Sequence, residues 1–331
     1  MLEGKSKNLF ISIVFIIGFS LGVSVSRICP FNKNIKDTGI RRITEKRLSS
    51  GAQLINPLLE CEQFSGGDIS LQRVEYKLKK YIKNQIEYNN ATLISVYLRD
   101  LNNGPWIGIN ENEKFAPASL LKIPIMIAYF KAAEGNFAIL EKQIKYETEA
   151  HDIPQEIPPA NALIPGNTYT VSELIRNMIV YSDNISKDLL LLNIDEKLLN
   201  QVYRDLELDI PNERTPEDFI SVKEYASFFR ILYNSSYLSK AMSEKALELL
   251  TEVDFPEGIV AGVPSNIKVA NKFGEREDNT KMKQLHDCGI VYYPGSPYLV
   301  CIMAKGTDLT RLSSVIGEIS KIVYENKKQN D

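Results

Sequence analysis

The amino-acid sequence predicts an α/β (α+β) fold in which a five-stranded, mostly antiparallel sheet is flanked by N- and C-terminal helices. Strand-like segments form two groups, at 91–115 and 267–306, and helical segments dominate between them. Amphipathic helical patterns stand before the first group and after the second. Because the strands flank the helical region, we expect an all-helical lobe, at about 119–250, inserted between strands two and three.

The elements before the lobe follow from hydrophobic spacing. Leu71 to about Tyr88 has one apolar helical face, formed by Leu71, Val74, Leu78, Ile82 and Ile86. The segment 91–101 alternates apolar and polar residues, as strands do, and 105–115 is expected to be the second strand. Residues 102–104, Asn-Asn-Gly, are typical of the turn between them.

The elements in and after the lobe have their own boundary signals. A capping box from Thr170 to Glu173 opens a helix at 172–180. Three further strands and a closing amphipathic helix are expected at 267–275, 287–294, 298–306 and 312–328. The short connections predict antiparallel pairing, and the two terminal helices can cover one face of the sheet.

Two cysteines fall in the last two strands. If the hairpin is symmetric about Gly295 and Ser296, Cys288 and Cys301 are diagonal neighbours on one sheet face. That separation is usually too long for a disulfide, so we expect two buried thiols.

Residues 1–26 form an anchor or signal segment. Leu9–Val25 is an apolar run of about the minimum length that spans a bilayer, and Lys5 and Lys7 precede it. This charge pattern predicts that the rest of the chain lies outside the cytoplasm. Ser24 and Ser26 also suit a cleavage site, so the protein is membrane-anchored or secreted.

Residues 27–68 show no sustained periodicity and are interpreted as a stalk or linker, which leaves 69–331 as the main domain. Cys29 and Cys61 lie in this linker and are candidates to pair in an oxidising compartment.

Composition excludes several classes of function. The formal net charge is −3, and no basic stripe with interleaved aromatics is present, so no nucleic-acid partner is expected. Two histidines and four cysteines, without a CxxC or HExxH motif, leave little material for a metal site. We expect neither a metal nor another cofactor.

Ser119 and Lys122 are the first candidates for catalysis. They stand three residues apart at the start of an otherwise apolar helix, and therefore on one face of it. A buried ammonium is costly unless something uses it, although a lysine can also extend to solvent. In the first helical turn, unpaired N–H groups favour an oxyanion at Ser119.

Two more polar segments follow along the chain. Ser182, Asp183 and Asn184 stand in a polar turn after the helix that ends at Val180, where a helix cap is the simpler interpretation. The segment 272–275, Lys-Phe-Gly-Glu, ends a strand, and its glycine permits close backbone approach.

The order SxxK, SDN and Lys-x-Gly resembles that of the class A β-lactamases and the related DD-peptidases, the penicillin-recognising serine hydrolases. The resemblance covers roughly 71–330 and includes the order of strands and lobe. It implies that Ser119 is the nucleophile and that Lys122, with its pKa lowered by burial and by Lys272, takes its proton. It implies that Ser182 relays a proton to the leaving nitrogen.

The resemblance also implies substrate contacts. Asn184 would hold a side-chain amide of the substrate, and Lys272 and Gly274 would face its carboxylate end. The backbone N–H groups of Ser119 and Glu275 would form the oxyanion hole.

The sequence departs from this pattern at two places. Phe273 stands where the family usually has Thr or Ser, so we expect the ring to fill part of the strand-edge groove and to weaken carboxylate recognition. In the loop after Ser-Asp-Asn, no glutamate has an asparagine four residues later. Glu213 and Glu217 are the candidates to position the deacylating water; both could equally be solvated charges.

Three functions remain open at this point. The first is a β-lactamase that hydrolyses β-lactams, whether rapidly or slowly. The second is a cell-wall DD-peptidase that acts on a peptidoglycan stem peptide, and the third is a sensor with no useful turnover. A Ser-His-Asp triad built on His151 or His286 is disfavoured, because no GxSxG elbow is present.

Overall fold

The computed structural model describes residues 41–47, 52–65, 69–102, 104–147, 155–206, 211 and 214–329. Contacts divide the chain into two units, Met1–Gly39 and Ile40–Asp331, and the described residues belong to the second. The fold below is therefore that of the second unit.

A five-stranded antiparallel sheet, with strand order β4-β3-β11-β10-β9, is the centre of the unit. Its strands are β3 (Leu93–Asp100), β4 (Trp106–Ile109), β9 (Val269–Glu277), β10 (Lys283–Val291) and β11 (Tyr298–Gly306). The two groups of strands predicted from the sequence join where β3 pairs with β11. The predicted single sheet is confirmed, and β9 is one of its two edge strands.

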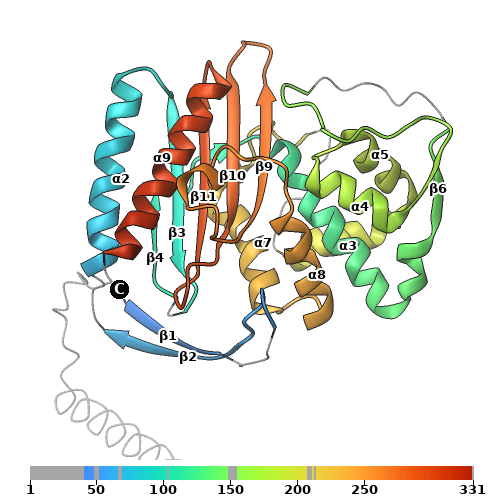
Figure 1. Cartoon of the computed structure of the whole chain (residues 1–331), viewed down its shortest axis with the longest axis horizontal. Coiled ribbons are helices and arrows are strands. Elements are labelled where there is room, and N and C mark those ends of the chain that lie inside the picture. Colours follow the sequence, from blue (N-terminus) through green and yellow to red (C-terminus); the bar gives the residue numbers. More distant parts are fainter. Residues whose placement is uncertain are drawn as a thin grey trace, which may run out of the picture. The chain divides into compact units, whose positions relative to one another are not determined.

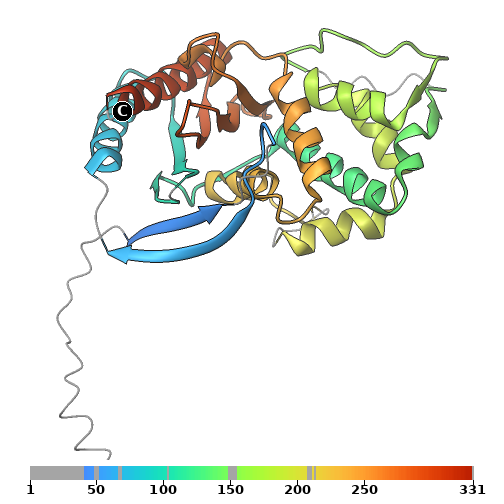
Figure 2. The ribbon, with the colours of Figure 1, turned by 60° about the horizontal axis from the view of Figure 1, so that its bottom comes forward.

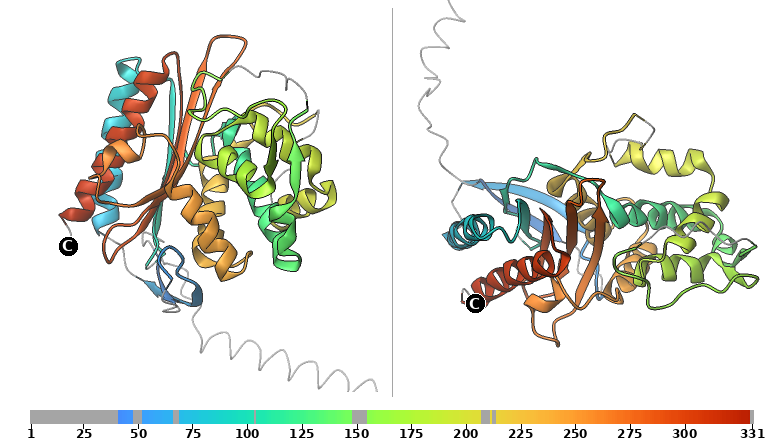
Figure 3. Two further views of the ribbon diagram at one scale, coloured as in Figure 1. Left: turned by 45° about the vertical axis from the view of Figure 1, so that its right-hand side comes forward. Right: turned by 90° about the horizontal axis from the view of Figure 1, so that it is seen from above.

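Helices cover both faces of the sheet. Along β11, Tyr298, Val300 and Ile302 contribute to one hydrophobic core, while Leu299 and Cys301 contribute to the other. Helices α2 (Ile69–Glu87) and α9 (Leu309–Lys328) pack on the first face, and Figures 1 and 3 show them side by side there. Burial on both faces explains why β11, the middle strand of the sheet, is almost wholly apolar.

The lobe packs on the second face and runs from the short turn before its first helix to α8. Its helices are α3 (Lys122–Gly135), α4 (Val171–Val180), α5 (Asn184–Asn193), α6 (Glu196–Asp205), α7 (Val222–Asn234) and α8 (Lys240–Thr251). Three short 3₁₀ turns accompany the fold, η1 (Ala118–Leu121), η2 (Phe137–Glu141) and η3 (Val260–Gly262). The predicted capping box is present, since Thr170 Oγ1 accepts from Glu173 N at 3.1 Å.

Small strands modify the expected all-helical lobe. They are β5 (Lys114–Phe115) with β8 (Ile220–Ser221), and β6 (Gln143–Lys145) with β7 (Thr168–Thr170). The strand expected at 105–115 is therefore divided, because Asn110 takes a left-handed conformation with φ of 52° and turns the chain.

The segment 27–68 contains more regular structure than expected for a linker. Strands β1 (Arg41–Arg47) and β2 (Leu58–Ser65) pair antiparallel, and Figure 2 shows them as a two-stranded ribbon. Between them, the N–H groups of Gln53 and Ile55 donate to the Glu244 carboxylate on α8. The division of the chain into a linker at 27–68 and a main domain stays a prediction, which allowed for patchy order. Within this segment, one carboxylate and the buried, apolar Ile55 hold a part that has no periodic pattern.

The register of the β10–β11 hairpin corrects the prediction for its cysteines. Cys288 lies directly opposite Cys301, so the hairpin is centred between Pro294 and Gly295 and not between Gly295 and Ser296. The two sulfurs form a disulfide instead of remaining free thiols. Cys29 lies outside the described residues, and its pairing with Cys61 stays a hypothesis.

The predicted membrane segment Leu9–Val25 also lies outside the described residues. Among the residues that are described, no helix is both long enough and apolar enough to cross a membrane.

Gly289 allows strand β10 to approach strand β9 closely. A Cβ atom at this position would lie 2.6 Å from the Ala270 carbonyl oxygen and 2.6 Å from Asn271 Cβ. We predict that Gly289→Ala lowers the free energy of unfolding by about 1–3 kcal/mol, because backbone atoms must move. Urea denaturation measures this loss.

The matched control is Gly135→Ala at the end of α3, where a Cβ meets nothing within 4 Å. This change should leave stability unchanged or raise it by up to about 1 kcal/mol. Equal effects at both positions would contradict the close approach at Gly289.

Candidate active site

Ser119 lies on a tight turn that leads into a buried helix. Pro117 caps the 3₁₀ turn η1, Ala118 has a left-handed φ of 48°, and Lys122 begins α3. Leu120 in the same turn is completely buried and anchors it in the core. Positive φ at a non-glycine residue is strained, and such strain is common at functional sites. The turn therefore fixes Ser119 on the lobe side of β9.

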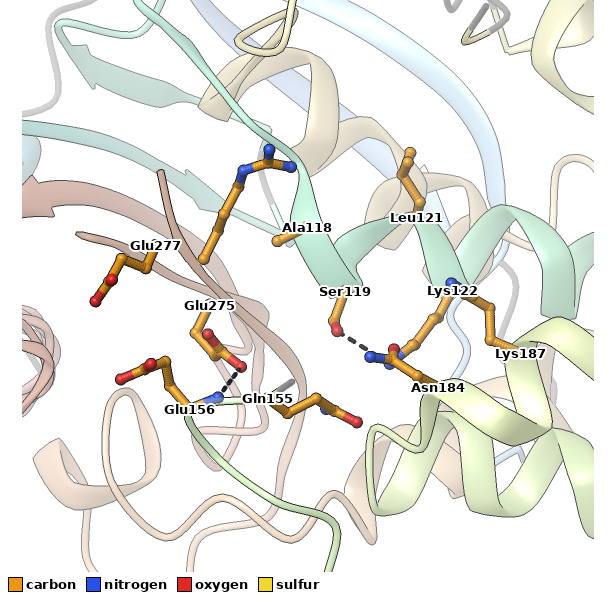
Figure 4. Close-up of a pocket in the computed structure, with 11 residues that line it drawn as sticks. Ala118, Ser119, Leu121, Lys122, Gln155, Glu156, Asn184, Lys187, Glu275 and Glu277 are labelled. Atoms are coloured by element: carbon orange, nitrogen blue, oxygen red, sulfur yellow. Dashed lines mark hydrogen bonds between the residues drawn. The ribbon is translucent and has the colours of Figure 1, made fainter. Parts of the chain in front are cut away.

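Lys122 is buried and directed at two serines. Its side chain is 1% exposed, and Nζ donates to Ser119 Oγ at 3.0 Å. The same ammonium donates to Ser182 Oγ at 3.2 Å and to the Ser182 carbonyl oxygen at 2.5 Å. Figure 4 shows Ser119 and Lys122 pointing toward one another. The predicted pair is thus assembled, and Lys122 does not extend to solvent.

Burial lowers the pKa of Lys122 to about 7, and the positive charge of Lys187 acts in the same direction. Asp183 and Glu275 oppose this shift in part. A large fraction of Lys122 is therefore neutral near pH 7, and a neutral amine can accept the proton of Ser119.

Ser182 occupies the turn between α4 and α5 and has a left-handed φ of 55°. The next residue, Asp183, caps α5 by accepting from Ser186 N at 2.7 Å. Asn184 is the first residue of α5 and lines the pocket. The helix-cap interpretation and the functional interpretation of this turn are therefore compatible, since the cap at Asp183 orients both neighbours.

Lys272 approaches the same hydroxyl from the sheet. It is completely buried in β9, and its Nζ donates to Ser182 Oγ at 2.9 Å. Burial, followed by the charge of Lys122, holds the pKa of Lys272 well below its usual value, whereas Asp287 opposes the shift. Two lysines from different elements thus converge on Ser182.

Gly274 provides the close approach expected of it. A Cβ atom here would lie 3.2 Å from the Pro117 carbonyl oxygen and 3.3 Å from Leu120 N. The backbone of β9 therefore packs against the backbone of the Ser119 turn. This contact places the main chain that leads to Glu275 beside the Ser119 turn.

A pocket of about 570 Å³ opens between the lobe and the edge of β9. Ser119, Lys122, Asn184 and Lys187 line it from the lobe, and Glu275 lines it from the strand. Figure 4 shows this arrangement. Lys272 is not among the lining residues, so it acts behind Ser182 and not at the pocket surface.

The structure corrects the expectation for Phe273. The ring is 3% exposed and stacks on Phe255, with ring centroids 4.3 Å apart. It belongs to the core on the α2 and α9 side of the sheet and does not fill the strand-edge groove. Lys272 Nζ lies 4.3 Å from the ring centroid, so the ring supports that ammonium by a cation–π contact.

The two candidates for deacylation have different outcomes. Glu217 forms an ion pair with Arg276 and is not among the residues that line the pocket. Glu213 lies outside the described residues, so its role stays a prediction.

Three residues at the pocket have contacts that the sequence did not predict. Gln155 Nε2 donates to the Ser182 carbonyl oxygen at 3.2 Å, and Glu156 N donates to Glu275 Oε1 at 3.1 Å. Gln155 and Glu156 lie in a segment without regular structure, where no pattern could mark them. The side chain of Glu275 was also missed, since only its backbone had an expected role.

His286, the histidine among the described residues, is not placed to form a triad. His286 is completely buried, its Nε2 lies 2.9 Å from the Ala116 carbonyl oxygen, and burial lowers its pKa to about 4. It does not line the pocket, and His151 lies outside the described residues.

Comparison with known proteins identifies the family to which this chain belongs. Residues 77–326 match the model of the beta-lactamase enzyme family. The chain belongs to this family. It is a serine hydrolase of the β-lactamase type, and the predicted relationship to the class A enzymes is confirmed.

Individual relatives are distant. Beta-lactamase VEB-1 of Pseudomonas aeruginosa is 23% identical over 270 residues, which cover 73% of this chain and 88% of the relative. The structure of PBP-A has 22% identity and a TM-score of 0.65, covering 78% of this chain and 97% of that chain. A class A beta-lactamase from Bacteroides cellulosilyticus has 16% identity and a TM-score of 0.66, covering 80% and 100%. These structures share the fold of this β-lactamase family member.

The pKa of Lys122 predicts how acylation depends on pH. The neutral amine is the form that accepts a proton, so the acylation rate should rise as pH increases through about 7 and then level off. Lys122→Arg keeps a permanent charge and should abolish this rise together with most of the rate. Lys131→Met on the exposed side of α3 is the control and should keep the profile. A wild-type rate that is constant from about pH 6 to 9 would contradict the assignment.

The burial of Phe273 predicts an effect on stability. Phe273→Thr should lower the free energy of unfolding by about 3–5 kcal/mol, because it leaves a cavity and a buried hydroxyl. Phe137→Thr, at a side chain that is 55% exposed, should change it by less than about 0.5 kcal/mol. Thermal or urea unfolding of both variants provides the comparison, and a Phe273→Thr protein as stable as wild type would place the ring elsewhere.

Proposed function

We propose that Ser119 is the nucleophile of this enzyme and is acylated by β-lactams, and that the acyl-enzyme is released slowly. The observation that carries this proposal is the hydrogen bond from buried Lys122 to Ser119 Oγ at 3.0 Å, together with the pKa of Lys122, which is lowered to about 7. A serine is a weak nucleophile unless an adjacent base removes its proton, and Lys122 is suited to that task.

The proton then follows the hydrogen bonds around Ser182. Neutral Lys122 takes the proton of Ser119 as Oγ bonds to the lactam carbonyl carbon. When the carbon–nitrogen bond breaks, Ser182 donates its hydroxyl proton to the leaving nitrogen. Ser182 recovers a proton from Lys122, whose Nζ is 3.2 Å away, and Lys272 at 2.9 Å stabilises the transient negative charge on the Ser182 oxygen.

Backbone and amide groups complete the proposed site. The N–H groups of Ser119 and Glu275 stabilise the carbonyl oxygen of the substrate, which is supported by the close packing of Gly274 on the Ser119 turn. Asn184 lines the pocket and is assigned to an amide of the substrate. A substrate carboxylate does not touch Lys272, because that lysine is buried behind Ser182 and does not line the pocket.

The proposal that the acyl-enzyme is released slowly is based on the surroundings of Glu217. This carboxylate is paired with Arg276 and does not line the pocket, so it is not placed to orient a deacylating water. A variant of PBP-A, one of the proteins with this fold, has a structure as an acyl-enzyme complex with penicillin G. A long-lived acyl-enzyme on this chain would be the behaviour of a DD-peptidase or a sensor.

Export of the domain is also proposed. The apolar run Leu9–Val25 after Lys5 and Lys7 supports it, and so does the disulfide between Cys288 and Cys301, since disulfides persist in oxidising compartments. Expression with and without residues 1–26 tests this. The full chain should be found outside the cytoplasm with its Cys288 and Cys301 oxidised, and the truncated chain should stay inside; equal distribution of both would contradict export.

Ser119→Ala tests the nucleophile. This variant should lose covalent labelling by a fluorescent penicillin while keeping the wild-type unfolding temperature, because only one hydroxyl is removed. Ser227→Ala on α7, whose hydroxyl donates to the Glu224 carbonyl oxygen, is the control and should label normally. Labelling of the Ser119→Ala protein would assign the nucleophile to another residue.

The fate of the label separates the remaining functions. We expect the label on the wild-type protein to persist for hours, and rapid loss would indicate an efficient β-lactamase. Release of D-alanine from a peptidoglycan stem peptide would then identify a DD-peptidase, and its absence with a persistent label would identify a sensor.

A further inference from the structure

The charges around the pocket are mostly neutralised by partners. Lys187 lies 3.0 Å from Asp188, and Glu277 accepts from Lys281 at 2.6 Å. Glu156 forms an ion pair with Lys283 at 2.6 Å. Arg276 is paired in the same way with Glu217. The charged side chains that line the pocket in these pairs are therefore already neutralised by their partners.

Glu275 differs from its neighbours on the pocket wall. Within the described part of the chain, its carboxylate has no ion pair within 4.0 Å of a lysine, arginine or histidine nitrogen. The side chain is half-buried, and burial raises its pKa above the ordinary value of a glutamate. The charge of Lys122 stabilises this carboxylate in part, but no cation pairs with it directly among the described residues. A partly desolvated carboxylate without a direct ion pair is unfavourable, and a cation in the pocket would stabilise it further.

The Glu275 carboxylate is held in a fixed position. Its Oε1 accepts from Glu156 N at 3.1 Å, and the backbone N–H of Ile157 is a second donor. Figure 4 shows the first of these hydrogen bonds on the β9 side of the pocket, across from Ser119. Backbone donors orient the carboxylate without cancelling its charge as a lysine would, so the carboxylate remains available to a ligand.

We propose that Glu275 is a specificity residue that selects acyl donors carrying an ammonium group. This inference rests on the proposed acylation of Ser119, and it assigns a substrate class to the same pocket. The ammonium lies against the Glu275 carboxylate while the reacting carbonyl lies at Ser119. A second carboxylate on the donor side chain would be repelled from this wall, so the selection acts in both directions.

A matched pair of β-lactams tests the proposal. Ampicillin and benzylpenicillin share the reactive ring and its carboxylate and differ by one amino group on the acyl side chain. We expect wild-type protein to be acylated about tenfold faster by ampicillin, since a hydrogen bond to a charged group has roughly that effect. At about 1 M salt the difference should shrink, because the Debye length falls to about 3 Å.

Glu275→Gln isolates the charge. The amide oxygen can still accept from Glu156 N, so the variant keeps this hydrogen bond. Loss of the charge also lowers the pKa of Lys122 further, so the readout is the ratio of the ampicillin rate to the benzylpenicillin rate within each protein and not either absolute rate. We expect its preference for ampicillin to disappear. Glu318→Gln, an exposed change on α9, controls for net charge and should keep the preference.

A peptide pair distinguishes the source of the ammonium group. Nα-acetyl-Lys-D-Ala-D-Ala has a free side-chain amine, and its Nε-acetylated form does not. Each is used to slow acylation of the wild-type protein by a fluorescent penicillin. Stronger competition by the free amine extends the selection to peptide donors, and equal competition limits it to β-lactams.

The outcomes separate the two proposals. Equal acylation of wild type by both penicillins, or an ampicillin preference that Glu275→Gln retains, would overturn the role of Glu275 and leave the nucleophile intact. Failure of both penicillins to label wild type would instead refute the acylation of Ser119, and the selection with it. The salt series on wild type tests the same role without any variant, because a preference that high salt leaves unchanged is not electrostatic.

Discussion

The convergence of two buried lysines on Ser182 is the interaction on which the site depends. Lys122 and Lys272 are both withdrawn from water, and both donate to the same hydroxyl. Two ammonium groups this close repel each other and resist desolvation, so the protein favours the neutral form of at least one. Burial and the charge of Lys187 lower the pKa of Lys122 to about 7. The buried position of this lysine is unfavourable for folding, and it produces a base beside Ser119 at neutral pH.

The rest of the fold holds this arrangement together. Helix α3 supplies Lys122, the α4–α5 turn supplies Ser182, and edge strand β9 supplies Lys272. Each comes from a different part of the chain, and the two hydrophobic cores on either side of the sheet fix their relative positions. Gly274 then allows β9 to touch the Ser119 turn, which no side chain at that position would permit without displacement.

Spacing and local residue type determine how much of this protein can be predicted from its sequence. The helices, the strands and the order of the three motifs can be predicted, because hydrophobic periodicity and residue type indicate them. Spacing carries less information about which face of an edge strand a side chain takes, so Phe273 was expected in the groove and lies in the opposite core. Whether Cys288 lies opposite Cys301 depends on the exact register of a hairpin. Gln155 lies in an irregular segment and contacts the site through a single hydrogen bond.

Phe273 and Glu275 together change the character of the pocket. The position that would present a hydroxyl to a carboxylate holds a ring that is turned into the core beneath Lys272. Two residues further along β9, the Glu275 carboxylate lines the pocket and forms no direct ion pair with a described residue. The first change removes a donor for an anionic ligand, and the second adds an acceptor for a cationic one. Glu275 also raises the pKa of Lys122, so in the proposed mechanism the residue that selects the substrate also influences the base beside Ser119.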